Sequence, residues 1–430
     1  MNMTIRVQLS VMMFVQFFVW GAWFVTMGNY LGAGLGFAGA DIGRAYSTTG
    51  YAAILSPLFV GMVADRFFSA QKVMGILHLL GAGLMFWATT ITTPGMFFFV
   101  VLAYAMCYMP TLALVNSISF NQMENPDTEF PWIRVFGTAG WIIAGFTITV
   151  LGWLGFENIE ATTTPFKMAA VASLLMGIYS FMLPDTPPKG KGQKATIVDL
   201  LGLDALTLMK DRSFAIFAVS SLLICVPLAF YYTFANLFLN DSGMTGVAMK
   251  MTFGQISEAA FMVVMPFFFA RLGVKKMLLF GMLAWVVRYF LFAYGNNDNL
   301  VFMFYGGILL HGICYDFFFV TGQLYVDREA PVAMRSNAQG FIALITYGVG
   351  MVIGNEIAGR WVGGLTEMVE ETVDGAVVEV AVYNWEKIWL MPAVMALVIV
   401  IGFALLFKDP GNGKAVEAEE IVEPVPGPTD

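Results

Sequence analysis

The chain has 430 residues, of which 58% are hydrophobic and only 12% charged, and its formal net charge is −8 at pH 7. An average soluble domain carries roughly 25% charged residues, so this composition excludes an ordinary soluble protein. A lipid bilayer accounts for the surplus, because about 20 apolar residues cross about 30 Å of hydrocarbon as a helix that satisfies its own backbone hydrogen bonds. The sequence therefore predicts an all-α membrane protein.

Apolar runs between charged or Pro- and Gly-rich breaks predict twelve transmembrane helices. The first six are expected near residues 7–30, 42–63, 72–92, 96–120, 133–154 and 165–184. The other six are expected near residues 213–239, 250–270, 275–294, 299–324, 335–359 and 384–407. The first run is too long for the apolar region of a signal peptide, so it is expected to remain as a helix.

A polar, Pro- and Lys-rich segment separates the two sets of six spans and predicts two equal halves. We expect an N-terminal six-helix bundle at 1–184, a cytoplasmic connector at 185–212 and a C-terminal six-helix bundle at 213–407. The remainder, 408–430, is rich in glutamate and is expected to be a disordered acidic tail.

The basic residues orient the predicted spans, because Lys and Arg accumulate in short cytoplasmic loops. Fifteen of the 22 fall on one side, namely Arg6, Arg66, Lys72, Lys189, Lys191, Lys194, Lys210, Arg212, Arg271, Lys275, Lys276, Arg328, Arg335, Lys408 and Lys414. Five fall on the opposite side, namely Arg44, Lys167, Lys250, Arg360 and Lys387. Both termini are therefore expected to be cytoplasmic.

Ionisable side chains inside the spans cost roughly 2.5 to 3.5 kcal/mol each on insertion scales, so each of them needs a reason. Gln255 and Glu258 are three residues apart, which places an amide and a carboxylate on one helical face, where both can reach the same cavity. The alternative is an interhelical hydrogen bond that only holds the bundle together.

The tenth span contains HGICYDFFF at 311–319. His311 and Tyr315 are four residues apart and share a face, whereas Asp316 points roughly 100° away. A carboxylate buried without a partner can gain and lose a proton during a transport cycle. The alternatives are a permanent ion pair for Asp316 and a core histidine with satisfied hydrogen bonds for His311.

A third group of polar residues lies on the fifth span, where Arg134, Thr138 and Trp141 follow at spacings of four and three. A guanidinium, a hydroxyl and an indole on one stripe suit a polar, ring-containing solute. An arginine at the start of a span can instead extend to the lipid headgroups. Tyr232, one turn before Asn236 on the seventh span, is a further aromatic residue beside a polar one.

Other polar residues in the spans are interpreted as structural. Arg288 is expected to have a structural partner near the outer surface, and Glu356 and Arg360, four residues apart, are expected to form a surface ion pair. The three cysteines lie singly on different spans without metal-ligand spacing, and we interpret them as small packing residues. They are Cys107, Cys225 and Cys314.

The sequence contains no phosphate-binding P-loop, no HExxH zinc motif and no GxSxG nucleophile between a strand and a helix. We therefore expect no cofactor, no metal and no energy from nucleotide hydrolysis. Secondary transport remains, in which two helical halves rock about a site near the membrane midplane.

The loop after the second span, GMVADRFFSAQKVM, resembles the signature of the major facilitator superfamily, with Gly61, Asp65 and Arg66 in place. A weaker basic echo, ARLGVKKM, occupies 270–277. Further segments resemble the bacterial nucleoside:proton symporters over nearly all of 8–407. They are QFFVWGAWFVTMGNY, YMPTLALVNSISF, FPWIRVFGTAGW, LLGLDALTLMK, QISEAAFMVVMPFFFARLGVKK, AWVVRYFLFAYG and YDFF.

The resemblance implies a major facilitator fold of two six-helix bundles in the bacterial inner membrane, and proton-coupled import of nucleosides by alternating access. It implies that Asp316 takes part in proton coupling, and our reading of the polar residues adds Glu258 to that role. The nucleoside site implied by the family motifs comprises Arg134, Thr138, Gln255, Glu258, His311 and Tyr315, with Trp141 at an aromatic position. We add Tyr232 as an aromatic contact. The expected partners are the solute, protons and the bilayer, with no nucleic acid, and the chain is expected to be a monomer.

Departures from the family pattern fall at the solute. Ala229 and Tyr232 stand where characterised members carry an amide pair, while His311 replaces an aromatic hydroxyl and Tyr315 a phenylalanine. Lost buried hydrogen-bond partners can change solute selectivity by orders of magnitude. The alternatives are a major facilitator transporter of a sugar, glycoside or other small metabolite, or an uncoupled facilitator. A membrane enzyme or sensor would require a catalytic cluster or an added soluble domain, and neither is evident.

Overall fold

The structure, a computed structural model, describes residues 1–60, 68–188, 196–373 and 376–409. Gly61, Asp65 and Arg66 of the predicted loop signature lie outside the described residues, as does most of the acidic tail. The long helices of the first half are α1 (Met3–Trp23), α3 (Gly39–Phe59), α5 (Ala70–Ala88), α6 (Pro94–Asn121), α7 (Pro126–Trp153) and α8 (Thr164–Ser180). A short helix, α2 (Met27–Asn29), and a π-helical turn, Tyr30–Gly34, follow α1.

The second half is also helical, and two of its spans are segmented. It comprises α9 (Ile197–Leu200), α10 (Arg212–Asp241), α11 (Val247–Tyr294), α12 (Val301–Leu309), α13 (His311–Tyr315), α14 (Thr321–Glu329), α15 (Arg335–Ala343), α16 (Met351–Gly364) and α17 (Trp385–Leu406). π-helical turns interrupt the segmented spans at Asp316–Val320 and Leu344–Gly350. Such turns are rare and recur at functional sites.

The helices agree with the predicted spans. Among the described residues, eight helical segments are long and apolar enough to cross a membrane. One of them, α11, covers two predicted spans, and its backbone is interrupted only at Gly273, where φ is +67°. Glycine adopts this left-handed conformation at little cost. The other predicted spans coincide with α3, α5 and α8.

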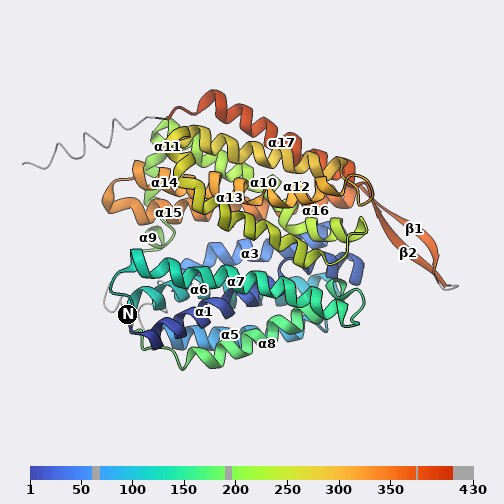
Figure 1. The fold of residues 1–430 in the computed structure, drawn as a ribbon, viewed down its shortest axis with the longest axis horizontal. Coiled ribbons are helices and arrows are strands. Elements are labelled where there is room, and N and C mark those ends of the chain that lie inside the picture. Colours follow the sequence, from blue (N-terminus) through green and yellow to red (C-terminus); the bar gives the residue numbers. More distant parts are fainter. Residues whose placement is uncertain (61–67, 189–195, 374–375, 410–430) are drawn as a thin grey trace, which may run out of the picture.

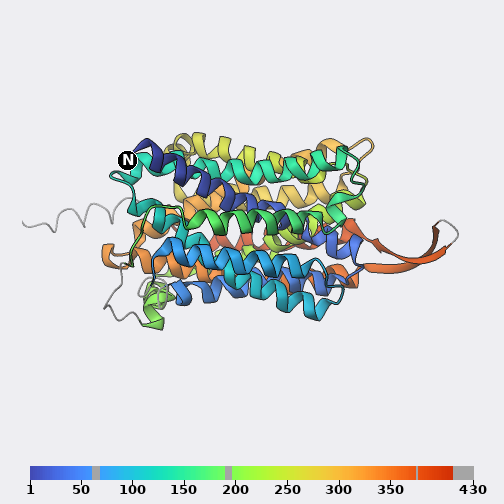
Figure 2. The ribbon, with the colours of Figure 1, turned by 90° about the horizontal axis from the view of Figure 1, so that it is seen from below.

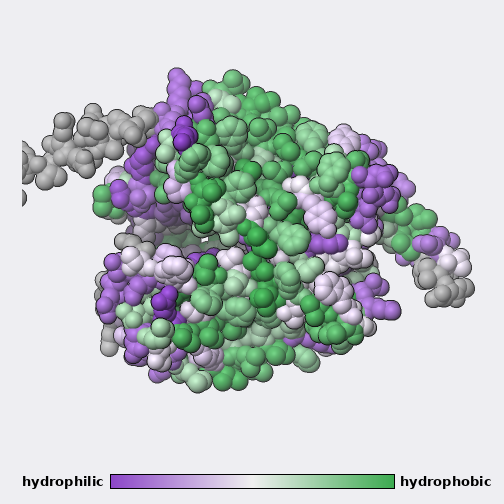
Figure 3. All heavy atoms as spheres, in the orientation of Figure 1, coloured by the Kyte–Doolittle hydropathy of each residue, from purple (hydrophilic) through white to green (hydrophobic). Residues whose placement is uncertain are grey.

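The helices form two layers that face each other (Figure 1). The lower layer in that view contains α1 and α5 to α8, and the upper layer contains α10 to α17, with α3 lying toward the junction. Figure 2 shows that the helices of both layers run along the long axis of the molecule. Apolar side chains cover most of the visible face between the two ends, as expected of a surface that meets lipid (Figure 3).

The two ends of the molecule differ. Strands β1 (Thr366–Val373) and β2 (Ala376–Tyr383) form an antiparallel hairpin that projects from the end opposite the N-terminus (Figure 1). This hairpin occupies the segment between the predicted spans 335–359 and 384–407. At the end that carries the N-terminus, Figure 3 shows a hollow between the two layers.

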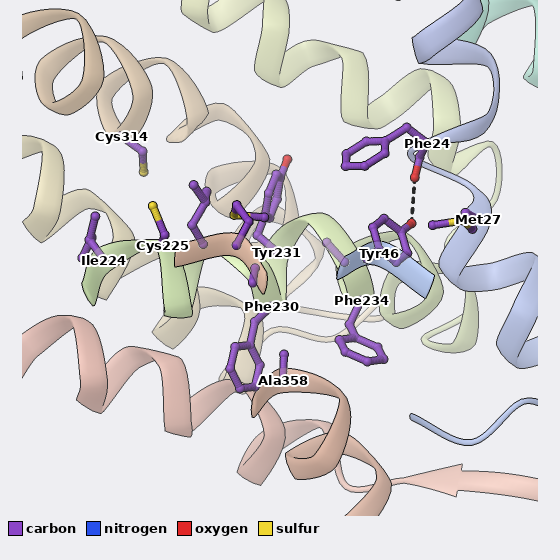
Figure 4. Close-up of a cluster of buried hydrophobic side chains, with 14 of the residues drawn as sticks. Phe24, Met27, Tyr46, Ile224, Cys225, Phe230, Tyr231, Phe234, Cys314 and Ala358 are labelled. Carbon is purple, nitrogen blue, oxygen red and sulfur yellow. Dashed lines mark hydrogen bonds between the residues drawn. The ribbon is translucent and has the colours of Figure 1, made fainter. Parts of the chain in front are cut away.

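The layers are packed closely toward the hairpin end, and one buried apolar cluster contains residues of both (Figure 4). Tyr46 of α3 donates a hydrogen bond to the Phe24 carbonyl oxygen at 2.7 Å and accepts one from the Gly28 N–H at 3.0 Å. A Cβ atom on Gly28 would lie 2.3 Å from the Thr233 carbonyl oxygen of α10. The first and seventh spans therefore meet backbone to backbone.

Candidate functional site

Aromatic side chains from both layers meet near the middle of the molecule. Trp20 of α1 packs edge-on against Trp141 of α7, with ring centroids 5.7 Å apart. Phe24, directly after α1, lies 6.4 Å from Trp141 and 5.9 Å from Tyr232 of α10. Phe24, Trp141, Tyr232 and Gln255 help to line a small cavity of about 20 Å³. Two predicted aromatic contacts, one from each layer, thus line the same cavity.

A polar cluster adjoins these rings in the upper layer. His311 Nε2 of α13 lies 3.7 Å from Glu258 Oε2 of α11, and the imidazole is almost fully buried. The imidazole ring stacks on Tyr231 at 5.5 Å and meets Tyr232 edge-on at 6.3 Å. A Cβ atom on Gly254 would approach His311 Cβ at 3.1 Å, so a glycine one turn before Glu258 allows α11 and α13 to pack closely. The structure therefore brings these two predicted residues together.

Tyr315 follows His311 by one helical turn, and their ring centroids are 5.9 Å apart. Its hydroxyl lies 3.0 Å from the hydroxyl of Tyr347, which comes from the π-helical turn Leu344–Gly350. Phe319 stacks on Tyr347 at 5.5 Å. Tyr347 was not among the residues predicted from the sequence, because its contact with Tyr315 joins two spans.

Asp316 opens the π-helical turn that follows α13 and is completely buried. Neither of its carboxylate oxygens has a hydrogen-bond partner among the described residues, and none of the ion pairs there involves it. Its carboxylate interacts electrostatically with Glu258. A permanent ion pair, the structural alternative for Asp316, is therefore absent from the described part of the chain.

The lower layer contributes Arg134 and Thr138 from α7. The Arg134 guanidinium carbon lies 4.3 Å from the centre of the Phe17 ring, a cation–π contact with α1. Arg134 also interacts electrostatically with Glu258 and Tyr315 of the upper layer. Thr138 is partly buried one turn further along α7, between Arg134 and Trp141. Arg134 is therefore linked to the polar cluster electrostatically, while its direct contact is with α1.

Two positions on neighbouring helices differ in what they offer to a solute. The Gln255 side-chain oxygen is buried at the cavity and has no hydrogen-bond partner within the described ranges. Ala229 packs against α16, because a Cβ atom built on Gly354 of α16 would lie 2.8 Å from the Cβ atom of Ala229. Of the pair Ala229 and Tyr232, only Tyr232 lines the cavity.

Residues interpreted as structural have structural contacts. Glu356 pairs with Arg360 at 3.6 Å, as expected, and also with Arg44 at 3.9 Å. Arg288 is completely buried, donates from Nε to the Gly307 carbonyl oxygen at 2.8 Å and lies 4.1 Å over the Tyr231 ring. Its partners are thus a backbone carbonyl and an aromatic face rather than a carboxylate, and its two terminal nitrogens have no hydrogen-bond partner among the described residues.

The cysteines are free, and two of the three are buried. In the part of the chain that the structure describes, no group of three or more His, Cys, Asp or Glu side chains could hold a metal ion.

Comparison with known proteins identifies the family. A family model described as nucleoside H⁺ symporter matches residues 3–412. The chain belongs to the nucleoside H⁺ symporter family. This family consists of transporters, so the predictions of a multi-pass membrane transporter and against an enzyme are confirmed.

Three Escherichia coli (strain K12) proteins are similar to this family member along nearly their whole length. YegT, which is provisionally named a nucleoside transporter, is 44% identical over 94% of both chains. The xanthosine permease is 34% identical and the nucleoside permease NupG 32% identical, each over 94% of this chain and 96% of its own length. The similarity therefore spans both halves.

Solved structures support the same conclusion about the fold. The crystal structure of the nucleoside transporter NupG matches with a TM-score of 0.84 at 32% identity, covering 95% of this chain and 100% of that one. A POT family transporter, PepTSo, matches with a TM-score of 0.68 at 14% identity, which speaks for the fold alone. The predicted major facilitator fold is confirmed.

Proposed function

We propose that this protein imports nucleosides together with protons by alternating access. The observation that carries the proposal is an inter-layer aromatic cavity beside the pair of Glu258 and His311, with a second carboxylate, Asp316, that interacts electrostatically with Glu258. The names of its relatives, a xanthosine permease and a nucleoside permease, agree with this solute class.

In this proposal the aromatic rings stack on the base, and the polar groups form hydrogen bonds with the rest of the solute. Trp141, Tyr232 and Tyr315 offer flat faces, and base–aromatic stacking in nucleic-acid sites contributes roughly 1 to 3 kcal/mol per base. Arg134, Thr138, Gln255 and His311 supply donors and acceptors. The unpartnered Gln255 oxygen supports this role, because a buried acceptor without a partner is costly unless a solute or water completes it.

The proposed proton carriers are Asp316 and Glu258. A buried carboxylate without a cationic partner is unstable while charged and is relieved by binding a proton. Glu258 can couple that proton to the solute, since it lies 3.7 Å from His311 of its own layer and interacts electrostatically with Arg134 of the other. We assign proton binding mainly to Asp316 and solute binding to Glu258.

We further propose the arrangement in the bacterial inner membrane. The end that carries the N-terminus is placed in the cytoplasm, on the strength of the basic residues, and the β hairpin outside (Figure 1). The same proposal includes the division into bundles at 1–184 and 213–407 and a chain that functions as a monomer. It also includes the loop signature at Gly61, Asp65 and Arg66.

The test is uptake of radiolabelled uridine and adenosine into proteoliposomes, with and without an inward proton gradient. Moving one charge down 100 mV gives about 2.3 kcal/mol, which supports roughly fifty-fold accumulation. Accumulation that needs the gradient is the expected result. Uptake that only equilibrates would indicate a facilitator, and no uptake of any nucleoside would contradict the solute class.

A second candidate solute is a sugar, glycoside or other small metabolite, favoured by the absence of an amide pair at Ala229, which packs against α16, and Tyr232, which lines the cavity. Thermal-shift measurements with panels of nucleosides and sugars separate the two, because a ligand stabilises the state that it binds. Stabilisation by sugars alone would establish this second candidate.

A further inference from the structure

Glu160 is a carboxylate buried at the junction of the two layers, away from the proposed solute site. It lies in the short turn Ile159–Ala161 between α7 and α8, and only 5% of it is exposed. All of its hydrogen-bond partners belong to the upper layer. It forms no ion pair among the described residues, so the charge is balanced by hydrogen bonds alone.

Both carboxylate oxygens of Glu160 are occupied. One accepts hydrogen bonds from the Asn236 and Asn240 side-chain amides of α10, at 2.8 Å and 3.2 Å. The other accepts the Ala248 backbone N–H of α11 at 2.9 Å. Ala248 is the second residue of α11, so the lower layer supplies an N-terminal cap to a helix of the upper layer.

The surroundings of this cap are tight. The Thr149 hydroxyl of α7 accepts the next backbone N–H, that of Met249, at 3.2 Å. A Cβ atom on Gly145 would lie 2.8 Å from the Ala248 carbonyl oxygen. Two side chains of the lower layer, those of Glu160 and Thr149, therefore cap the first turn of α11. The close approach of Gly145 to Ala248 brings the backbones of α7 and α11 together.

Glu160 also lies between two cavities. On the hairpin side is a cavity of about 1050 Å³, which Glu160 and Asn240 line together with Thr366 of the hairpin. On the other side, Asn236 donates to the Met251 sulfur at 3.8 Å, and Met251 lines the small aromatic cavity. Glu160 therefore lines the hairpin-side cavity, and through Asn236 its hydrogen bonds reach a residue that lines the aromatic cavity.

We propose that Glu160 is the latch that holds the hairpin-side entrance shut. Opening that entrance requires the layers to part there, which breaks all three hydrogen bonds and uncaps α11. Water can then hydrate the freed carboxylate, so the same residue stabilises the closed entrance and is not left buried and unpaired in the open one. The proposal rests on alternating access and not on the identity of the solute.

The test measures how often the entrance opens. Thr233 is 1% exposed, lies outside the lining of the hairpin-side cavity, and has a carbonyl oxygen that a Cβ atom on Gly28 of the other layer would overlap, so Thr233→Cys reports separation of the layers. The reporter is placed in a protein whose three native cysteines are replaced by alanine. A membrane-impermeant maleimide is added on the hairpin side, without solute, so that a wrong solute assignment leaves the result intact.

We expect Glu160→Ala to raise the labelling rate roughly tenfold or more, the effect of losing a hydrogen bond to a charged group. Glu160→Gln is expected to raise it less, because the amide retains one oxygen acceptor. The matched control is Glu157→Gln, an exposed carboxylate three residues earlier in the same turn region, which should leave the rate unchanged.

Two outcomes would overturn the latch. One is a folded Glu160→Ala protein that is labelled at the rate of its parent. The other is an equal increase in Glu157→Gln, which would make the effect one of loop charge. Should Glu160→Ala fail to fold, the paired Asn236→Ala and Asn240→Ala variants remove the opposite side of the same bonds, and unchanged labelling in both would equally reject it.

Discussion

The two histidines lie in opposite layers, and their surroundings differ. His78 of α5 has partners at both ring nitrogens, since Nδ1 lies 3.0 Å from the Ser173 hydroxyl and Nε2 lies 2.8 Å from the Gln16 side-chain oxygen. Gln16 in turn donates to Thr111 at 2.7 Å. His311 has no partner at Nδ1 within the described residues, and its Nε2 is 3.7 Å from Glu258.

This contrast does not follow from burial, because both imidazoles are almost fully buried. The His78 cluster joins α1, α5, α6 and α8 of one layer and leaves little hydrogen-bonding capacity unused. The cluster of His311, Glu258 and Asp316 keeps unused capacity in the interior. Fully satisfied polar networks rigidify a fold, whereas unsatisfied buried groups need another explanation, such as a ligand or a proton.

The sharpest test of the upper cluster is Asp316→Asn. The amide cannot carry a proton through the cycle, so we expect solute binding to persist while gradient-driven accumulation falls from roughly fifty-fold at 100 mV to equilibration. Proteoliposome uptake measures accumulation, and a thermal shift measures binding. The matched control, Asp298→Asn, changes an exposed carboxylate between α11 and α12 and should accumulate normally. Undiminished accumulation by Asp316→Asn would remove the residue from coupling.

Glu258→Gln and Arg134→Ala test whether the two layers hold the solute between them. Each should weaken solute affinity by about tenfold, the lower range for losing a hydrogen bond to a charged group. Equilibrium binding to the purified protein provides the measurement. The controls are Glu386→Gln at the start of α17 and Arg360→Ala, whose side chain is 76% exposed. Unchanged affinity in both site variants would place the solute elsewhere.

His78→Leu and His311→Leu compare the two layers directly. Removing His78 leaves Gln16 and Ser173 buried without that partner, and each orphaned group costs about 1 to 3 kcal/mol, so we expect a clear loss of stability with binding intact. Removing His311 breaks no short hydrogen bond, so stability should be kept while solute affinity falls. Unfolding curves measure the stability of the two variants, and binding isotherms measure their solute affinity. Equal destabilisation of the two variants would contradict the proposed difference between His78 and His311.

Local spacing predicted much of what lies within one helix. The stripe of Arg134, Thr138 and Trp141 and the pair Gln255 and Glu258 follow from helical periodicity, and the twelve spans followed from runs of apolar residues. Periodicity says nothing about partners on other helices. For that reason Phe24, which packs between Trp141 and Tyr232, did not stand out among 40 phenylalanines.

Glu160 shows the same limit in a loop. It was not among the residues predicted from the sequence, because its burial depends on contacts 76 to 88 residues away in the chain. A signal was present in Asn236 and Asn240, which are four residues apart on one face of an apolar span and together require an acceptor. The π-helical turns at Asp316 and Tyr347 had no such signal, since they depend on packing.

The smallest expected effect comes from Tyr347→Phe. Its hydroxyl lies 3.0 Å from that of Tyr315, while its ring stacks on Phe319, so phenylalanine keeps the packing and removes one hydrogen bond. A neutral hydrogen bond contributes about 1 kcal/mol, which corresponds to roughly fivefold in affinity if it orients Tyr315 toward the solute. Tyr294→Phe, which removes an exposed hydroxyl at the end of α11, should leave affinity unchanged. The same binding experiment measures the affinity of Tyr347→Phe. An affinity equal to that of the parent would show that Tyr315 needs no orienting partner, and Tyr347 would then not belong to the solute site.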